Sequence, residues 1–334
     1  MPPWGVVFFL AAFIFYLVTL APGVLDHDGA QFQTLGYTGG VAHPTGYPLY
    51  IMILRTFVCC LPIGDVAFRV NLVSAVFASL TVMLVYYFCF LTLRNHLASL
   101  VAAISLGVSS TFWIYGITAE VYSLHLFFMM CILVVLLWWK QTQKPQLLWL
   151  LSFLLGVSFS HHRMTLLLIP SVLYFVLAYW KKENRVNLLR MSLVVAILFI
   201  VGLSVYLYSY HQISIDNPAN EYQVLTQYLP QLGITEADWN STWKKFLCLI
   251  STGRYKWDIL VFTTPRFVEN LAAVVPNLLH QFALGVVVGM VGLIISFLKD
   301  RRLAWFLFSL FGIHILFALV VHGEFQVWLL PGNV

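Results

Sequence analysis

The chain has 334 residues, of which 61% are hydrophobic and only 9% charged, and its mean hydropathy is +0.88. Water-soluble domains carry about 25% charged residues, so this composition excludes a soluble enzyme or binding domain. The net charge is +5, but the basic residues are dispersed over short polar breaks, and we expect no nucleic-acid partner.

Long apolar stretches follow one another along the chain. A bilayer core is crossed by about 20 apolar residues, and backbone groups in lipid must pair within the segment, which favours helices. Residues 188–208 and 282–298 lack the apolar–polar alternation of barrel strands. We therefore predict an all-α integral membrane protein, a polytopic helical bundle of about nine spans. The predicted spans are 4–22, 67–93, 97–113, 118–139, 147–161, 164–180, 188–209, 271–297 and 303–321.

The stretch 46–61 is also apolar, but it is short and contains Pro48 and Arg55, so we predict an outer interfacial helix after the first span. The distribution of basic residues supports this choice, because short cytoplasmic loops are rich in Lys and Arg. The short loops predicted to be cytoplasmic hold Arg94, Lys140, Lys144, Lys181, Lys182, Arg185, Arg190, Lys299, Arg301 and Arg302. The short outer loops hold only Arg55, Arg69 and Arg163.

Three regions are predicted from this topology. Residues 1–209 form a transmembrane core with a first outer loop at 23–66, and residues 210–270 form an extracytoplasmic loop or cap. Residues 271–334 add further transmembrane helices, and the chain is either a short form or a truncated one. The membrane would be the bacterial cytoplasmic membrane, or the endoplasmic reticulum in a eukaryote, with the site on the extracytoplasmic or lumenal side.

The first outer loop carries the strongest candidate site. Asp26 and Asp28 lie just past the first span, and the turn-prone run 43–48 brings His43 back toward the membrane face. A carboxylate there could deprotonate a hydroxyl acceptor, and His43 or a divalent cation held by Asp26, Asp28 and His43 could assist a phosphate leaving group. The alternative is that the acids are simply solvated near the membrane surface.

Other ionisable residues recur at the predicted outer ends of spans. Glu120 begins the fourth span, where it could serve the site or merely stabilise the helix dipole. Arg163, in an outer turn beside His162, could bind a lipid phosphate bidentately, or it could be a topology anchor. Arg69 and Asn71 are similar candidates, and snorkelling of Arg69 to headgroups is the alternative.

Five short blocks, in order, resemble those of the DUF2723 family, which includes TMEM260-type protein O-mannosyltransferases. The blocks are DGAQF at 28–32, HPTGYPL at 43–49, RVNLVS at 69–74, EVY at 120–122 and SHH at 160–162. The family pattern reads approximately D-S-G-E-F, H-P-P-G-x-P-L, R-x-N-L-x-S, E-V-Y and N-H. This sequence departs from it at Gln31, where the family has an acid, and at Thr45, where it has a second proline.

The resemblance implies a GT-C-like fold and a glycosyltransferase that moves a sugar, mannose or another hexose, from a polyprenyl-phosphate donor. The acceptor would be a hydroxyl on a protein, lipid or glycan at the outer face of the bilayer. It also implies that Asp28 is the catalytic carboxylate, a choice over Asp26 that depends on the fifteen-residue spacing to His43. The predicted substrate-binding residues are Asp26, His43, Arg69, Glu120, Tyr122, His162 and Arg163.

Two other classes of function remain open. A transporter or flippase predicts ionisable residues at mid-membrane depth and paired broken helices, whereas the acids here lie at span ends or in loops. A non-catalytic assembly subunit is the other alternative, because Gln31 replaces the family's acid. The sequence has no glycine-rich nucleotide-binding motif, in agreement with a donor that enters from the bilayer.

Overall fold

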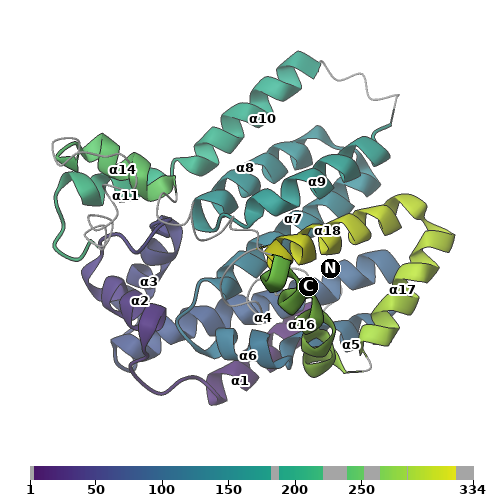
Figure 1. The fold of residues 1–334 in the computed structure, drawn as a ribbon, viewed down its shortest axis with the longest axis horizontal. Helices are drawn as coiled ribbons and strands as arrows, with labels where there is room; N and C mark the ends of the chain where they lie inside the picture. The colour runs from purple at the N-terminus through teal and green to yellow at the C-terminus, as the bar shows by residue number, and fades with distance from the viewer. Residues whose placement is uncertain (1–3, 182–187, 221–238, 252–263, 284, 321–334) are drawn as a thin grey trace.

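The computed structural model describes residues 4–181, 188–220, 239–251, 264–283 and 285–320. These residues form helices joined by turns, which confirms the predicted all-α class (Figure 1). The helices are α1 (Trp4–Val18), α2 (His27–Thr38), α3 (Pro48–Cys60), α4 (Val66–Leu93), α5 (His96–Gly107), α6 (Ser110–Ile117), α7 (Tyr122–Thr142), α8 (Pro145–His161), α9 (Thr165–Tyr179), α10 (Leu188–Leu203), α11 (Tyr206–Ser214), α14 (Thr242–Ile250), α16 (Thr264–Phe282), α17 (Gly285–Lys299) and α18 (Arg301–Val320).

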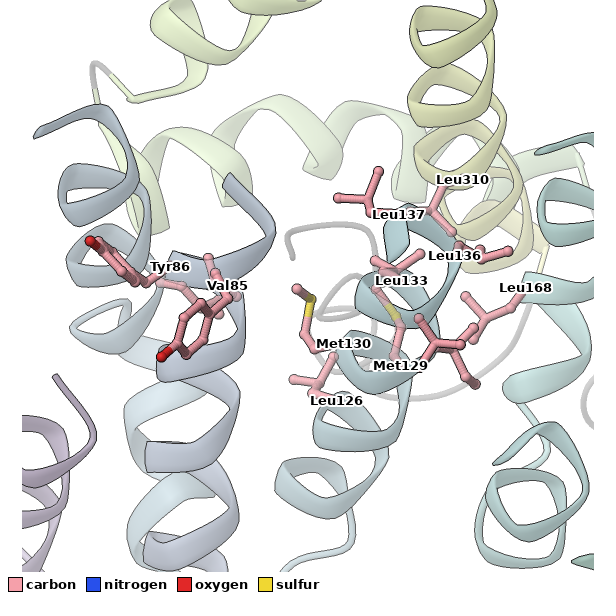
Figure 2. Packing of buried hydrophobic residues seen from close by; sticks show 14 of the residues in the cluster. Val85, Tyr86, Leu126, Met129, Met130, Leu133, Leu136, Leu137, Leu168 and Leu310 are labelled. Carbon is pink, nitrogen blue, oxygen red and sulfur yellow. The ribbon is translucent and has the colours of Figure 1, made fainter. Parts of the chain in front are cut away.

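Helix α7 is the centre of the bundle. It is apolar on every face, and most of its side chains are buried. Figure 2 shows its leucines and methionines between Val85 and Tyr86 of α4 on one side and Leu168 of α9 and Leu310 of α18 on the other. In lipid the apolar side chains gain little from leaving water, so close van der Waals packing holds such a helix in place.

Helices α8 and α10 meet through small residues. A Cβ atom on Gly156 would collide with the backbone oxygen of Phe199, and one on Gly202 would lie 2.6 Å from the backbone oxygen of Phe153. One turn earlier, the Ser152 hydroxyl donates a hydrogen bond to the carbonyl of Val195 at 2.6 Å. This close approach explains why glycines are tolerated inside two apolar helices.

The number of membrane spans differs from the prediction. Among the described residues, α4, α7 and α18 are long and apolar enough to cross a bilayer, and six spans result if each of three bent helix pairs counts as one. Helices α1, α3, α8 and α9 are apolar but shorter. Nine spans are therefore not confirmed, although the separate short helix predicted at 46–61 is present as α3.

Two predicted spans are bent at a serine that comes two residues after a glycine. Helices α5 and α6 form a 65° bend at Val108 and Ser109, and α10 and α11 form a 41° bend near Ser204. The Ser109 hydroxyl bonds to the carbonyl of Leu106, and the Ser204 hydroxyl bonds to that of Val201. Such back-bonding competes with the helical ladder and explains both bends.

The region predicted as a cap is only partly described. Helix α14 packs on α11, where the Tyr210 and Phe246 rings lie 5.6 Å apart, and α11 in turn contacts α3 (Figure 1). Residues 221–238 and 252–263 of this predicted cap lie outside the described residues.

The opposite end of α7 is joined to α9 and α18 by polar contacts. Asp300 receives hydrogen bonds from Lys140 Nζ at 2.9 Å and from the Tyr179 hydroxyl at 2.6 Å. It also caps α18 by accepting the backbone N–H of Leu303. Partial burial alone would raise the pKa of Asp300, but the hydrogen bonds from Tyr179 and Lys140 outweigh it and lower this pKa to about 2.

We expect the α8–α10 contact to be sensitive to one added methyl group. Gly202→Ala should lower the free energy of unfolding by about 1–3 kcal/mol, because backbone atoms of α8 fill the space. Thermal unfolding in detergent would measure it. Gly292→Ala in α17 is the matched control, since no atom lies within 4 Å of its added Cβ, and its stability should be unchanged or slightly higher. Equal effects of the two substitutions would contradict the packing argument.

Asp300→Asn should destabilise the protein by about 1 kcal/mol at pH 7, a value that allows for the partial solvent exposure of the pair. Because the folded pKa is lowered, the contribution of Asp300 is present above the unfolded pKa of about 4 and is lost as the pH falls toward about 2. The difference between wild type and variant in thermal unfolding should therefore be constant from pH 7 to pH 5 and shrink below pH 4. Asp26→Asn, at an exposed carboxylate, should show no such difference.

Candidate functional site

Two helices at one end of the bundle position the first candidate residues. The segment 27–38 was predicted as loop, but it forms α2, which buries Phe32 and Leu35 against α3 and α4. Gln33 donates a hydrogen bond to Asn71 at 3.0 Å, and Asn71 donates to the carbonyl of Ala21 at 3.0 Å. Asn71 therefore joins α4 to the end of the first apolar segment, a structural role that sequence reasoning did not anticipate.

Asp28 and His43 are brought together as predicted. The Asp28 Oδ2 atom lies 3.7 Å from His43 Nε2, and the Asp28 side chain is 57% exposed whereas that of His43 is 15% exposed. Gln31, one turn after Asp28, contacts the other ring nitrogen, since its Oε1 atom lies 2.5 Å from His43 Nδ1. This contact places the hydrogen on Nδ1 and leaves Nε2, the nitrogen facing Asp28, to exchange a proton.

Gln31 stands where the family pattern has an acid, and it contacts His43. A neutral amide holds the imidazole at the position where the family has an acid. Asp26 does not take over this place. It lies exposed at the N-cap of α2, and its side chain makes no cap hydrogen bond and no ion pair within the described part of the chain.

A row of rings, the ring wall, extends from His43 into the bundle and consists of His43, Tyr47, Tyr122 and His162. The Tyr47 ring lies 5.0 Å from that of His43 and 6.1 Å from that of His162. Tyr122, at the start of α7, lies 5.9 Å from His162. The structure thus brings His43, Tyr122 and His162 into one neighbourhood, and it adds Tyr47, which belongs to a predicted sequence block but was not selected as a site residue.

His162 is buried together with two neighbouring histidines, His125 and His161. The His161 Nε2 atom donates a hydrogen bond to the carbonyl of Val121 at 3.0 Å, and His162 Nδ1 accepts the backbone N–H of Met164 at 3.3 Å. The His125 ring lies 4.6 Å from that of His162, tilted by 34°. Burial, reinforced by the nearby His161 and His43, lowers the pKa of His162 to about 3, so this imidazole is neutral at physiological pH. His162 can therefore donate a hydrogen bond but brings no positive charge.

Glu120 lies at the margin of this neighbourhood. Its backbone N–H and carbonyl both lie 3.4 Å from the Ser74 hydroxyl, which in turn is 3.4 Å from the Tyr50 hydroxyl. The Glu120 carboxylate is close enough to Tyr50 for an electrostatic interaction. Glu120 therefore lies beside Tyr50, at the edge of the ring wall.

The two predicted arginines have different surroundings. Arg69 donates hydrogen bonds of 2.9 Å to the carbonyls of Val58, Ile63 and Gly64, so its guanidinium fastens the end of α3 to α4. These bonds leave Arg69 outside the group that the structure brings together. Arg163 instead follows His162 directly, and its guanidinium lies 4.9 Å from the centre of the Phe159 ring.

The donor geometry of the site does not favour a divalent cation. In the described ranges, no three or more His, Cys, Asp and Glu side chains are arranged to hold a metal ion. Asp28 and His43 approach each other, but Asp26 is not part of the same group. These residues do not fit a metal site, and we derive no chemical step through a cation.

The low pKa of His162 has a measurable consequence for stability. Because its folded pKa lies below the unfolded value of about 6.5, the unfolded state binds the proton more readily, and stability falls as the pH drops from about 6.5 toward 3. His162→Asn keeps an acceptor for the Met164 N–H but cannot be protonated. Thermal unfolding between pH 7 and pH 5 should show a shallower loss of stability in this variant, by up to about 1.4 kcal/mol per pH unit.

His280→Asn is the matched control, because His280 is exposed on α16. It should keep the slope of the wild type. A slope in His162→Asn equal to that of the wild type would show that His162 is accessible to protons in the folded state.

The comparisons with known proteins agree with the sequence blocks. The model of the Protein O-mannosyl-transferase TMEM260 N-terminal domain matches residues 28–187, which include Asp28, His43, Tyr122, His162 and Arg163. Protein O-mannosyl-transferase TMEM260 of Mus musculus is 26% identical over 197 residues, which are 58% of this chain and 28% of the relative. Its counterpart from Dictyostelium discoideum is 24% identical over 220 residues, 60% of this chain and 26% of the relative.

The chain thus spans about a quarter of the length of these curated relatives. The matched region begins at the candidate carboxylate and ends after α9, so it contains the ring wall and its supporting helices. Through residues 28–187, this chain is related to the TMEM260-like family, as the order of its sequence blocks predicted.

Proposed function

We propose that the chain is a membrane glycosyltransferase that moves a hexose, mannose in the first instance, from a polyprenyl-phosphate donor to a hydroxyl acceptor. The observation that carries the proposal is the exposed Asp28 carboxylate beside His43, in a segment that matches the TMEM260 family model. The names of the two relatives, both protein O-mannosyl-transferases, support transfer of mannose.

The chemistry assigned to Asp28 is that of a general base. A carboxylate that is 57% exposed can receive an acceptor hydroxyl and take up its proton. The acceptor oxygen then forms a bond to the anomeric carbon of the sugar while the bond from that carbon to the phosphate oxygen breaks. The electron pair of the broken bond stays on the departing lipid phosphate, and this single displacement inverts the anomeric configuration.

His43 and the ring wall would orient the two substrates. Gln31 fixes the His43 imidazole with Nε2 toward Asp28, so the ring can share the proton that Asp28 receives. The Tyr47, Tyr122 and His162 side chains offer flat surfaces and polar atoms for a sugar. Arg163, the nearest basic residue after His162, would face the phosphate of the donor.

The remaining features follow from a lipid-linked donor. Its prenyl chain would enter from the bilayer between helices, which explains a site built at the end of an apolar bundle rather than in a nucleotide-binding domain. The proposal places this end on the extracytoplasmic or lumenal side and adopts a GT-C-like arrangement for the bundle. The hydroxyl acceptor is a protein, a lipid or a glycan.

Asp28→Asn should reduce sugar transfer about 100- to 10,000-fold, because the amide cannot accept the proton of the acceptor. The measurement is transfer, or donor hydrolysis, by the purified detergent-solubilised protein with polyprenyl-phosphate mannose, beside a binding measurement with the same donor. Asp65→Asn is the matched control: it replaces an exposed carboxylate at the same end of the bundle by an amide that also caps α4.

Asp26→Asn is the discriminating arm of the same experiment. A larger loss of transfer in Asp26→Asn than in Asp28→Asn would assign the base to Asp26. Absence of turnover in the wild type, with no donor binding, would reject the glycosyltransferase in favour of an assembly subunit or a transporter.

A further inference from the structure

Four buried polar groups near Arg163 have no hydrogen-bond partner among the described residues. The atoms are Thr45 Oγ1, Arg163 Nε, the Tyr206 hydroxyl and Ser209 Oγ. Three of the residues are nearly fully buried, since Ser209 is 0% exposed, Thr45 5% and Tyr206 8%, whereas Arg163 is partly exposed and buries its Nε atom. A buried polar group without a partner costs about 1–3 kcal/mol, and folded proteins contain few of them.

The four groups come from three separate segments that meet at one place. The Tyr206 hydroxyl lies within reach of both the Arg163 guanidinium and the Thr45 hydroxyl, but neither contact has the geometry of a well-formed hydrogen bond. Tyr206 and Ser209 lie three residues apart on α11, so they share one face. The Ser209 hydroxyl lies 3.3 Å from the position that a Cβ on Gly46 would occupy, next to Thr45.

Gly46 is what allows the loop to approach α11 so closely. Its φ angle is +88°, and an added Cβ would lie 2.9 Å from Leu249 of α14. The α2–α3 loop, the α8–α9 turn and α11 therefore meet at this point, with Tyr206 beside Arg163 and Thr45, and Ser209 beside Gly46.

The chemistry of these four groups indicates the charge of a ligand that would bind between them. All four can donate a hydrogen, and the guanidinium carries a fixed positive charge. Within the described residues the ion pairs are His43–Asp28 and Lys140–Asp300, so no carboxylate neutralises Arg163. The chemistry that satisfies a guanidinium and three hydroxyl donors at once is an anion with several oxygen atoms.

We propose that Thr45, Arg163, Tyr206 and Ser209 form a subsite for a single phosphate group. The phosphate chemistry follows from the four side chains alone. The choice of a prenyl phosphate as its source rests on the proposed function. Tyr206 and Ser209 lie beyond residues 28–187, the part that matches the family model, so the subsite draws on a region that this match does not reach.

The proposal is tested by direct binding to the purified full chain in detergent. Farnesyl phosphate, farnesol and inorganic phosphate are compared as ligands. Farnesyl phosphate should bind and farnesol should not. Tyr206→Phe and Ser209→Ala should each weaken farnesyl phosphate about tenfold, the value of one hydrogen bond to a charged group.

Tyr208→Phe is the matched control in the same helix. It removes the same phenolic oxygen two residues away, but that oxygen faces Gly39 and Arg55 rather than Arg163. Its affinity for farnesyl phosphate should equal that of the wild type. Equal loss in Tyr206→Phe and Tyr208→Phe, or no loss in either, would overturn the subsite.

Stability without ligand supplies a second readout. If the Tyr206 hydroxyl is kept for a ligand, Tyr206→Phe should melt at the same temperature as the wild type or higher, while losing the stabilisation that farnesyl phosphate confers. A lower melting temperature with unchanged affinity would show a purely structural hydroxyl and reject the proposal.

Two further arms separate the sources and the two proposals. Inorganic phosphate that binds as well as farnesyl phosphate, and weakens in the same variants, would support the subsite but assign it to free phosphate. Asp28→Asn should bind farnesyl phosphate normally. If farnesyl phosphate binds normally but no sugar is transferred, the subsite is retained and the glycosyltransferase is rejected. If Tyr206→Phe transfers sugar as well as the wild type, the glycosyltransferase is retained and the subsite is rejected.

Discussion

The burial of α7 on all sides is the constraint on which the rest of the structure depends. A helix without a polar face must be covered by apolar helices, and α4, α8, α9 and α18 provide that cover. The ends of this helix are consequently fixed. At one end Lys140 meets Asp300, and at the other the carbonyl of Val121 receives His161. The core thus sets the distance between the helix ends that carry the polar chemistry.

The candidate site lies at one end of that core, where polar residues replace the apolar ones. Contacts run from Asp28 to His43, then through the Tyr47 ring to His162, which is followed directly by Arg163. One margin of this series is acidic and the other basic, and tyrosine and imidazole rings lie between them. A transfer reaction needs a proton acceptor for one substrate and a stabiliser of negative charge for the other, and the two groups occur at opposite margins.

Several features of this arrangement were predictable because they are local in sequence. The proximity of Asp28 and His43 followed from a turn-prone run that folds back, and the short helix after it followed from Pro48 and the length of the apolar stretch. Others were not predictable. Helix α2 has weak apolar periodicity and is held by burial of Phe32, and the serine-directed bends shorten two predicted spans.

The sequence by itself determined the all-α membrane class and the relation to the TMEM260-like family, because apolar length and the order of short motifs are properties of the chain alone. Only the tertiary structure decided the partners of the arginines. Arg69 and Arg163 look alike in sequence, but the first is held by three carbonyls and the second lies beside the Tyr206 hydroxyl and the Phe159 ring. The reason is physical: a guanidinium binds the oxygen atoms that folding brings within reach, and those come from distant segments.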